Sequence, residues 1–466
     1  MKVMFVFVIF MFSLHDLLLA DTGQTLGQEE AGSVEQDEDA LLEGDDHLSE
    51  EDFLFEEPFL ATDENLGLYS SSDKNFNDQA SSFTTWPKDL RVSLQGDLKY
   101  NVDLHQTEVR RSSLRMKYET AMWTSSYLRL DAKYQYFNQG DFLVADLLVG
   151  TGQSSYGNAS LNAAWFQYRV NDCTIKLGQQ SLFWGAVEGS YAVDVIAPID
   201  ATQPLLTDFS EIRTSQHMAV FNCYLNKSEI ELIYLPKPLT DLYQHKERTA
   251  TNELEDSLHE EFGFRLTQHW EGFDLSLMYA HLYGNTPHIR LNPFDQESIQ
   301  LIVPRYDFWA LSAVWAIDRL LVKGDLAYST DQFLTSRSLI TDAISSEGQL
   351  EIAFGFEYTT SRSHLFAINV WQYKHINEFK TDPSLYARTW NVSWNKEFYN
   401  DTLSLSLLGL WLDQPKRQLT TLLAEYQWND FWVFSSALQF GDNIQQLGLI
   451  EPEPQLALQV SMKYQF

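Results

Sequence analysis

The chain has 466 residues, with 65 acidic against 32 basic side chains and a formal net charge of −33. So large a negative charge argues against nucleic-acid binding, which needs Lys and Arg to neutralise phosphates. No apolar run of about 18 residues is present, which excludes a helical membrane span and leaves the closed β-barrel as the one membrane architecture.

The first 85 residues differ in composition from the rest. Residues 1–20 are predicted to be a secretory signal peptide, with Lys2 before an apolar core and Ala20 at a plausible cleavage position. Residues 21–85 hold nineteen acidic residues and one basic residue, Lys74, so we expect a disordered periplasmic segment. Its acidic and aromatic stretch 52–60 is either a docking motif for a periplasmic partner or part of a solubilising tail.

Hydrophobic alternation begins at Asp89 and continues to the end of the chain. Between Leu90 and Leu104 the apolar residues occupy even positions and the polar residues odd ones. A period of two is typical of β-strands with one apolar face, although a soluble β-sandwich shows it as well. Later runs with the same period are Phe273 to Tyr283, Trp309 to Ile317, Leu350 to Tyr358, Tyr386 to Trp394, Leu403 to Trp411 and Trp432 to Phe440.

Short and long connections alternate between these runs, and this favours a membrane barrel over a sandwich. Short polar turns are predicted at 171–172, 226–227, 271–272, 318–319, 400–401 and 429–430. Longer insertions lie between them, around 181–212, 237–260, 285–304, 330–348, 376–384 and 412–418. Outer-membrane barrels have short periplasmic turns and long outer loops.

Aromatic residues are placed near the ends of the predicted strands, as expected of girdles at two membrane interfaces. These residues are Trp123, Trp165, Trp270, Trp309, Trp394, Trp411, Trp428, Trp432 and Tyr464. The pattern therefore predicts an all-β fold over 86–466, a transmembrane antiparallel β-barrel. Nineteen strands can be counted, but such barrels have even numbers, so about 18 strands (16–20) are expected. The least certain strands are Phe142–Val149 and the region Ile299–Ile317.

The last strand, Gln455 to Phe466, ends Tyr464-Gln-Phe466. This ending resembles the closing strand of Gram-negative outer-membrane β-barrels. The resemblance implies recognition by the barrel-assembly machinery, contact with outer-membrane lipid and location in the cell outer membrane. The alternative is an edge strand of a soluble β-protein.

The region 177–212 carries the most distinctive motif. It contains Gly178, Gln180, Trp184, Gly185, Asp194, Pro198 and Asp200, followed by Arg213 and a Tyr234-Leu-Pro236 strand end. These residues resemble an uncharacterised, porin-like family of Gram-negative outer-membrane β-barrel proteins, known as a domain of unknown function. The resemblance implies an outer-membrane barrel and no particular substrate.

The connection 181–212 is too long and too apolar for a solvated surface loop, because Trp184 and many aliphatic residues need burial. We expect it to fold into the lumen as a constriction; an outer lid or a subunit contact is the alternative. The candidate constriction residues are Trp184, Glu188, Asp194, Asp200, Asp208, Glu211 and Arg213.

Charged residues occupy lumen-facing positions on the first three predicted strands. The basic ones are Arg91, Lys99, Arg111, Arg115, Lys117, Arg129 and Lys133, among the acidic Asp97, Asp103, Glu119 and Asp131. Opposite an acidic loop, the basic ladder would create a transverse field, as charged rings do in selective pores. Alternatively, these charges simply neutralise each other.

The two cysteines lie beside short turns, Cys173 after 171–172 and Cys223 before 226–227. In an oxidising compartment, neighbouring strands would allow a cross-strand disulfide that clamps the base of the long loop; separate thiols are the alternative.

The sequence contains no nucleophile motif and no convincing metal-ligand spacing, so no enzyme activity, catalytic residue, metal or cofactor is predicted. Two functions remain. One is a porin-like channel for small solutes or hydrophobic compounds. The other is a non-conducting structural or binding barrel whose acidic tail engages a periplasmic partner.

Overall fold

The computed structural model describes residues 89–103, 105–139, 154–200, 213–241, 254–292, 295–333, 346–376, 386–413, 416–441 and 455–466. The predicted signal peptide, the acidic segment and the strand proposed at Phe142–Val149 all fall outside these ranges. None of the described helices is long and apolar enough to cross a membrane.

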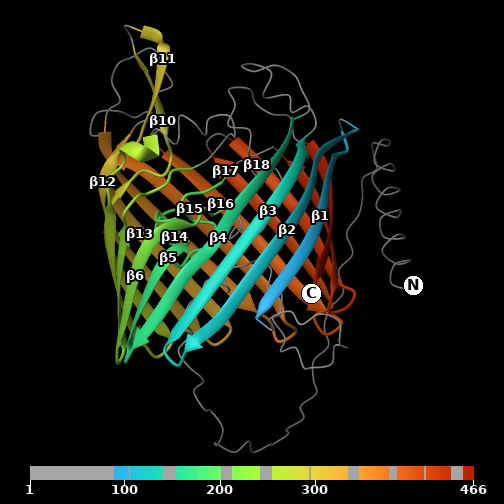
Figure 1. The fold of residues 1–466 in the computed structure, drawn as a ribbon, viewed down its shortest axis with the longest axis horizontal. Helices are drawn as coiled ribbons and strands as arrows, with labels where there is room; N and C mark the ends of the chain where they lie inside the picture. The colour runs from blue at the N-terminus through green and yellow to red at the C-terminus, as the bar shows by residue number, and fades with distance from the viewer. Residues whose placement is uncertain are drawn as a thin grey trace, which may run out of the picture. The chain divides into compact units, whose positions relative to one another are not determined.

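Eighteen strands form one closed antiparallel sheet, and two further strands form a separate hairpin (Figure 1). The first half of the barrel contains β1 (Leu90–Asn101), β2 (Gln106–Trp123), β3 (Ser126–Gln139), β4 (Ser154–Val170), β5 (Cys173–Gln180), β6 (Gln216–Leu225), β7 (Ser228–Leu235), β8 (Glu261–Trp270) and β9 (Phe273–Tyr283). The second half contains β12 (Arg305–Ile317), β13 (Leu320–Phe333), β14 (Ser346–Thr359), β15 (His364–Ile376), β16 (Tyr386–Phe398), β17 (Leu403–Asp413), β18 (Lys416–Gln427), β19 (Trp432–Gly441) and β20 (Gln455–Gln465). The predicted fold and strand number are confirmed.

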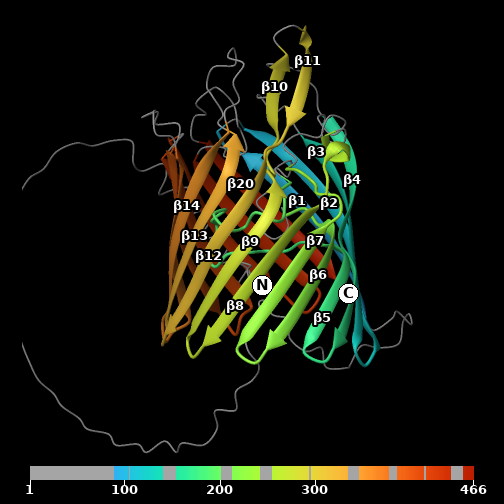
Figure 2. The same ribbon diagram turned by 90° about the vertical axis from the view of Figure 1, so that its left-hand side faces the viewer.

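The strand proposed in the region Ile299–Ile317 is only partly right. The barrel strand there is β12, which pairs directly with β9. Residues from 299 to 302 instead belong to β11 (Asp295–Ile302), which pairs with β10 (His288–Asn292) in a hairpin that extends beyond the barrel rim (Figure 2). An insertion with strand-like alternation therefore does not have to join the barrel sheet.

The first and last strands close the barrel. β20 pairs with β1 from Ser93 opposite Gln465 to Asn101 opposite Ala457. Beyond the last strand residue, the Phe466 amide donates to the Val92 carbonyl at 2.9 Å, and the Val92 amide donates to the Phe466 carbonyl at 3.0 Å. Closure leaves no unpaired edge, and that is required of a sheet surrounded by lipid.

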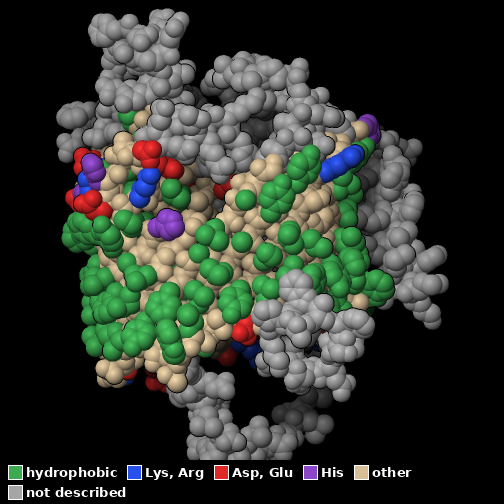
Figure 3. Space-filling model, in the orientation of Figure 1, with side chains coloured by type: hydrophobic (Ala, Val, Ile, Leu, Met, Phe, Trp, Pro, Cys, Tyr) green, Lys and Arg blue, Asp and Glu red, His purple; other side chains and the backbone are tan. Residues whose placement is uncertain are grey.

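The alternation of the sequence sorts side chains onto the two faces of the wall. On β20, Val460 and Met462 are 46% and 47% exposed, whereas Gln459 and Ser461, at the alternate positions, are buried. The exposed set faces outward, where apolar side chains cover the middle of the barrel and charged ones gather mainly near its edges (Figure 3). Such an outer surface suits hydrocarbon.

The predicted short turns are all present at one end of the barrel. Asn171, Asn226 and Asp318 adopt positive φ angles of 54°, 58° and 51°, and Gly272 adopts 68°. Asn, Asp and Gly tolerate this conformation, which two-residue hairpin turns need. The predicted longer connections join strands at the other end of the barrel, but the one expected around 412–418 is short, since β17 ends at Asp413 and β18 begins at Lys416.

Most of the predicted girdle residues are exposed on the outer face, including Trp123, Trp270, Trp309 and Trp428. Trp165 is the exception, since it is only 8% exposed and lies beneath the Lys176 ammonium at 4.4 Å. A register shift in β4, opposite Asp131 and Ala132 of β3, turns the odd positions of β4 inward from Ala163 onward. The sequence pattern did not reveal this bulge.

Deleting Phe466 removes both terminal hydrogen bonds between β20 and β1, so we expect defective barrel assembly. The measurement is the fraction of protein that migrates as a heat-modifiable, protease-resistant barrel in unheated gels. Tyr399→Ala, which removes an exposed aromatic residue from a turn, serves as the control and should assemble normally. Normal assembly of the Phe466 deletion would refute the role assigned to this end.

Candidate functional site

The connection after β5 folds into the barrel and packs against the inner wall (Figure 2). Its buried apolar residues are Trp184, Val187, Ala192, Val193 and Ile196. They share one hydrophobic cluster with Met218 and Val220 of β6, Ile233 and Leu235 of β7, Met278, Ala280 and Leu282 of β9, Tyr306, Phe308 and Ala310 of β12, Ala327 of β13 and Ala353 of β14. We call residues 181–200 the inner loop.

Polar contacts hold the first half of the inner loop at two points on the wall. The Asp325 carboxylate on β13 accepts the amides of Ala186 at 3.2 Å and Val187 at 3.0 Å. Trp184 Nε1 donates to the Glu231 carboxylate on β7 at 2.7 Å. A buried carboxylate is a stronger acceptor than a neutral group, so both Asp325 and Glu231 hold this segment. We call Asp325, which accepts two backbone amides of the loop, the latch.

The second half is tied to the strand ends beside β6 and β9. Gln216 donates to the Ile196 carbonyl at 2.7 Å, and Asn285 donates to the Val195 carbonyl at 2.8 Å. The Ile199 amide donates to Asp241 at 2.8 Å. The loop therefore has anchors at both of its ends and in the middle.

The tip of the inner loop, around Gly189 and Tyr191, reaches β15 and β16. Gly189 has a φ of 70°, and a Cβ there would lie 2.8 Å from the Asn391 amide nitrogen on β16. The ring of Tyr191 lies edge-on to that of Trp371 on β15, with centroids 5.7 Å apart. The positive φ favours glycine at position 189, and a larger side chain there would displace the Asn391 amide.

The acidic residues of the loop are largely engaged with the protein. Asp194 forms a buried ion pair with Arg213, and Glu188 lies 3.6 Å from Lys323 on β13. Trp184 is 1% exposed, so it packs into the wall and is not presented to solute. Asp200 lies at the end of the described part of the loop and also interacts within the protein. Asp208 and Glu211 lie outside the described residues.

The expectation that the loop presents its acids to solute therefore needs correction at Asp194, and at Glu188 only a partly exposed carboxylate remains. Burial raises the pKa of Asp194 to about 7, and the neighbouring Arg213 guanidinium opposes that rise. Burial also raises the pKa of Glu188, against the effect of Lys323.

The charged ladder on β1–β3 consists to a large degree of ion pairs. Arg111 lies 2.7 Å from Asp97, Arg115 lies 2.6 Å from Asp131, and Arg129 lies 3.2 Å from Glu119. The other basic members, Arg91, Lys99, Lys117 and Lys133, also interact within the protein. At these three pairs the opposite charges neutralise each other, as in the alternative interpretation of the ladder.

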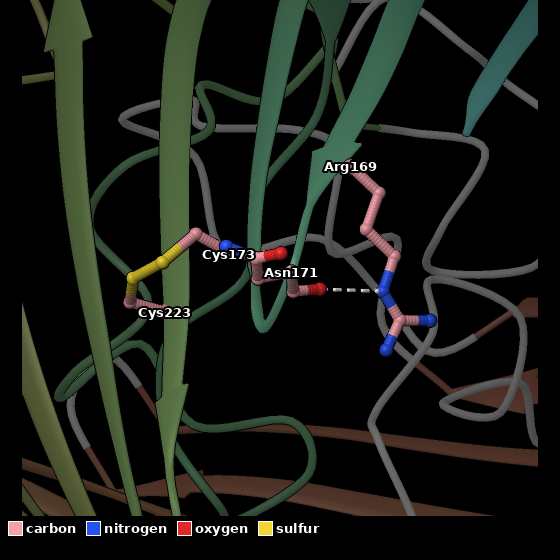
Figure 4. Close-up of a disulfide and its surroundings, with 4 residues drawn as sticks. All are labelled: Arg169, Asn171, Cys173 and Cys223. Carbon is pink, nitrogen blue, oxygen red and sulfur yellow. Dashed lines mark hydrogen bonds between the residues drawn. A yellow bond between two sulfur atoms is a disulfide. The ribbon is translucent and has the colours of Figure 1, made fainter.

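Cys173 and Cys223 form a disulfide (Figure 4). They are opposite each other in the β5–β6 register, with Cα atoms 4.1 Å apart, which is within bonding reach. Beside them the Arg169 side chain donates to the Asn171 carbonyl at 3.1 Å. The bond lies at the turn end of β5 and β6, whereas the inner loop leaves from the opposite end at Gln180. It therefore fixes the register of the pair and does not clamp the loop directly.

Sequence reasoning missed the wall residues that hold the loop, namely Glu231, Asp325, Lys323 and Asn391. Lys323 and Asp325 interrupt an otherwise apolar run at odd positions of 320–328. The alternation that identified the ladder on β1–β3 could have found them. Nothing in the sequence shows that their partners lie about 140 residues earlier.

Within the described residues, no group of three or more His, Cys, Asp or Glu side chains is placed to hold a metal ion. The inner loop, its anchors and the opposite ladder together describe a lumen narrowed from one side. This arrangement defines the class: a large antiparallel β-barrel with an internal loop.

Comparison with solved structures finds similarities at low sequence identity. OpdQ of Pseudomonas aeruginosa shares 12% identity, with 81% of this chain and 98% of that chain covered and a TM-score of 0.46. Salmonella typhi OmpF, solved in complex with daunomycin, shares 11% identity, with 81% and 97% covered and a TM-score of 0.41. OccAB1 of Acinetobacter baumannii shares 7% identity, with 81% and 95% covered and a TM-score of 0.46.

No family model and no curated protein matches the chain. The resemblance of the Trp184-Gly185 region to an uncharacterised family therefore stays a likeness of motif.

Asp325→Ala removes the acceptor of two loop amides, and we expect hydrogen exchange at Ala186 and Val187 to accelerate roughly tenfold to a hundredfold, from a loss of about 1–3 kcal/mol. Glu271→Gln, an exposed change in the β8–β9 turn, should leave those amides protected. Equal hydrogen-exchange rates at these amides in both variants would contradict the role of Asp325 in holding the loop.

The raised pKa of Asp194 predicts a pH-dependent stability. The folded protein holds this proton more tightly than the unfolded chain, whose Asp pKa is near 3.8. The contribution of Asp194 to the free energy of unfolding therefore falls as pH rises from about 4 to about 7, by a few kcal/mol at most, and is constant above. Denaturant titrations at several pH values should show a steeper slope in the wild type than in Asp194→Asn. An identical slope in both proteins would contradict the assignment.

Proposed function

We propose that this protein is an outer-membrane channel through which small solutes diffuse past the inner loop. The observation that carries the proposal is the position of that loop, packed on the lumen side of the wall between β6 and β16. A segment in that position narrows a passage, whereas a lid or a subunit contact would lie outside the bore.

The barrel is wide enough for such a passage. With about 18 strands, side chains alone do not fill the interior, and a water-filled lumen is expected. The contacts between loop and wall described above fall on β6–β9 and β12–β16, or on the residues just before β6 and just after β7 and β9. The solute path is then lined by the inner loop on one side and by β17–β20 and β1–β4 on the other.

Location in the outer membrane is supported by two features. The outer face is apolar along the strands, with Phe354, Phe356, Leu277 and Ile368 each about half exposed, and hydrocarbon is the environment that stabilises such a surface. The predicted signal peptide and the terminal Phe466 agree with export and assembly by the barrel-assembly machinery. A non-conducting barrel whose tail engages a partner remains the competing function, and the experiment below separates the two.

Shortening the connection between β5 and β6, which contains the inner loop, should widen the passage. We expect deletion of residues 186–208 to raise single-channel conductance about twofold or more in planar bilayers, because the narrowest section limits ion flow. The control is removal of residues 290–300, most of the β10–β11 hairpin, which extends beyond the barrel rim, so conductance should be preserved.

Unchanged conductance after the loop deletion would contradict the constriction. Absence of any channel activity in the intact, assembled protein would instead favour the non-conducting barrel.

A further inference from the structure

The inner face of β17 and β18 carries leucine side chains that the hydrophobic cluster around the inner loop does not include. They are Leu408, Leu410 and Leu412 of β17 and Leu419 and Leu423 of β18, and we call them the leucine strip. Leu408, Leu410, Leu412 and Leu423 are partly exposed.

Strand register shows that the strip faces the lumen. Leu410 lies opposite Asn391 of β16 and Leu419 of β18, which are 6% and 8% exposed. The adjacent Leu407 and Trp411 are 43% and 39% exposed on the outer face. Inward leucines are unusual in a lumen whose neighbouring positions are Asn, Ser and Thr, because a water-filled passage favours polar side chains.

The strip lies beside the narrow section. Gly189 at the tip of the inner loop approaches Asn391, and Asn391 is the direct partner of Leu410. A solute that passes the tip of the loop therefore meets Leu410 and its neighbours.

A continuous row of inward positions connects the strip to the charged ladder. Leu423 pairs with Ala437 of β19, and Ala437 pairs with Gln459 of β20. Gln459 in turn pairs with Lys99 of β1. Three strand spacings of about 4.8 Å separate Leu423 from Lys99, or about 14 Å. The ladder has seven basic and four acidic side chains, so it keeps a net positive charge after Arg111, Arg115 and Arg129 pair with Asp97, Asp131 and Glu119.

We propose that the leucine strip and the ladder form one amphipathic track for organic anions that carry an apolar chain. The chain runs over the leucines, and the anionic head remains hydrated among the charges of β1–β3. This inference rests on the proposed channel function and names the class of solute that the channel favours.

Single-channel recording with octanoate tests the track, with acetate as the short anion and octyltrimethylammonium as the cation of equal chain. In the intact protein, octanoate should interrupt the KCl current with longer residence than either comparison ion. Leu410→Asn with Leu423→Asn should shorten octanoate residence roughly fivefold or more, since apolar contact is lost, whereas KCl conductance stays near the wild-type value. Leu410→Met keeps the apolar surface and should keep the residence time.

The outcomes separate the two proposals. If the intact, assembled protein does not conduct, the channel function and the track both fail. If it conducts but the double variant binds octanoate as long as the wild type, the track fails and the channel stands. Equal or longer residence of octyltrimethylammonium would overturn the preference for anions.

Discussion

Closure of the sheet between β1 and β20 is the constraint on which the rest of the structure depends. A strand in hydrocarbon has no water to satisfy its backbone, so every amide and carbonyl on the wall needs a partner on a neighbouring strand. The antiparallel register from Ser93–Gln465 to Asn101–Ala457, extended by Val92 and Phe466, provides those partners for the two ends of the chain. Only a closed wall separates an apolar outside from an inside that can be polar.

The inner loop depends on that separation. Its Trp184, Val193 and Ile196 would be unfavourable in the water of an open lumen, and they are buried because β6–β14 present Met, Leu, Phe and Ala side chains inward at the matching places. Buried carboxylates then hold the backbone: Asp325 accepts loop amides, and Glu231 accepts the indole of Trp184. Apolar packing and charged acceptors together keep the segment on one side of the bore, and this asymmetry creates the passage.

The outer architecture could be predicted from the sequence because it follows local rules. Alternation sets the face of each strand, and residues such as Asn171, Asn226 and Asp318 mark turns through their tolerance of positive φ. The hairpin β10–β11 shows the limit, since its alternation does not reveal whether it joins the barrel. Trp165 shows a second limit of such prediction, because one bulge in β4 turns its side chain toward the inside of the barrel.

The site was harder to predict because its contacts are long-range. The length and apolar character of 181–212 suggested a segment inside the lumen, but the pairing of Asp194 with Arg213 and of Glu188 with Lys323 depends on where the loop folds. Acidic residues that look available in the sequence are engaged by partners on distant strands. The leucines of β17 likewise read as one apolar run, and only register with Asn391 and Thr421 shows which of them face inward.

The most direct test of a passage beside the inner loop is swelling of liposomes that contain the purified, assembled protein, measured with neutral sugars of increasing size. An open lumen narrowed from one side predicts rapid swelling with the smallest sugars and a steep decline as the sugar grows. Liposomes that do not swell with any sugar, although the barrel is folded in the bilayer, would contradict the account.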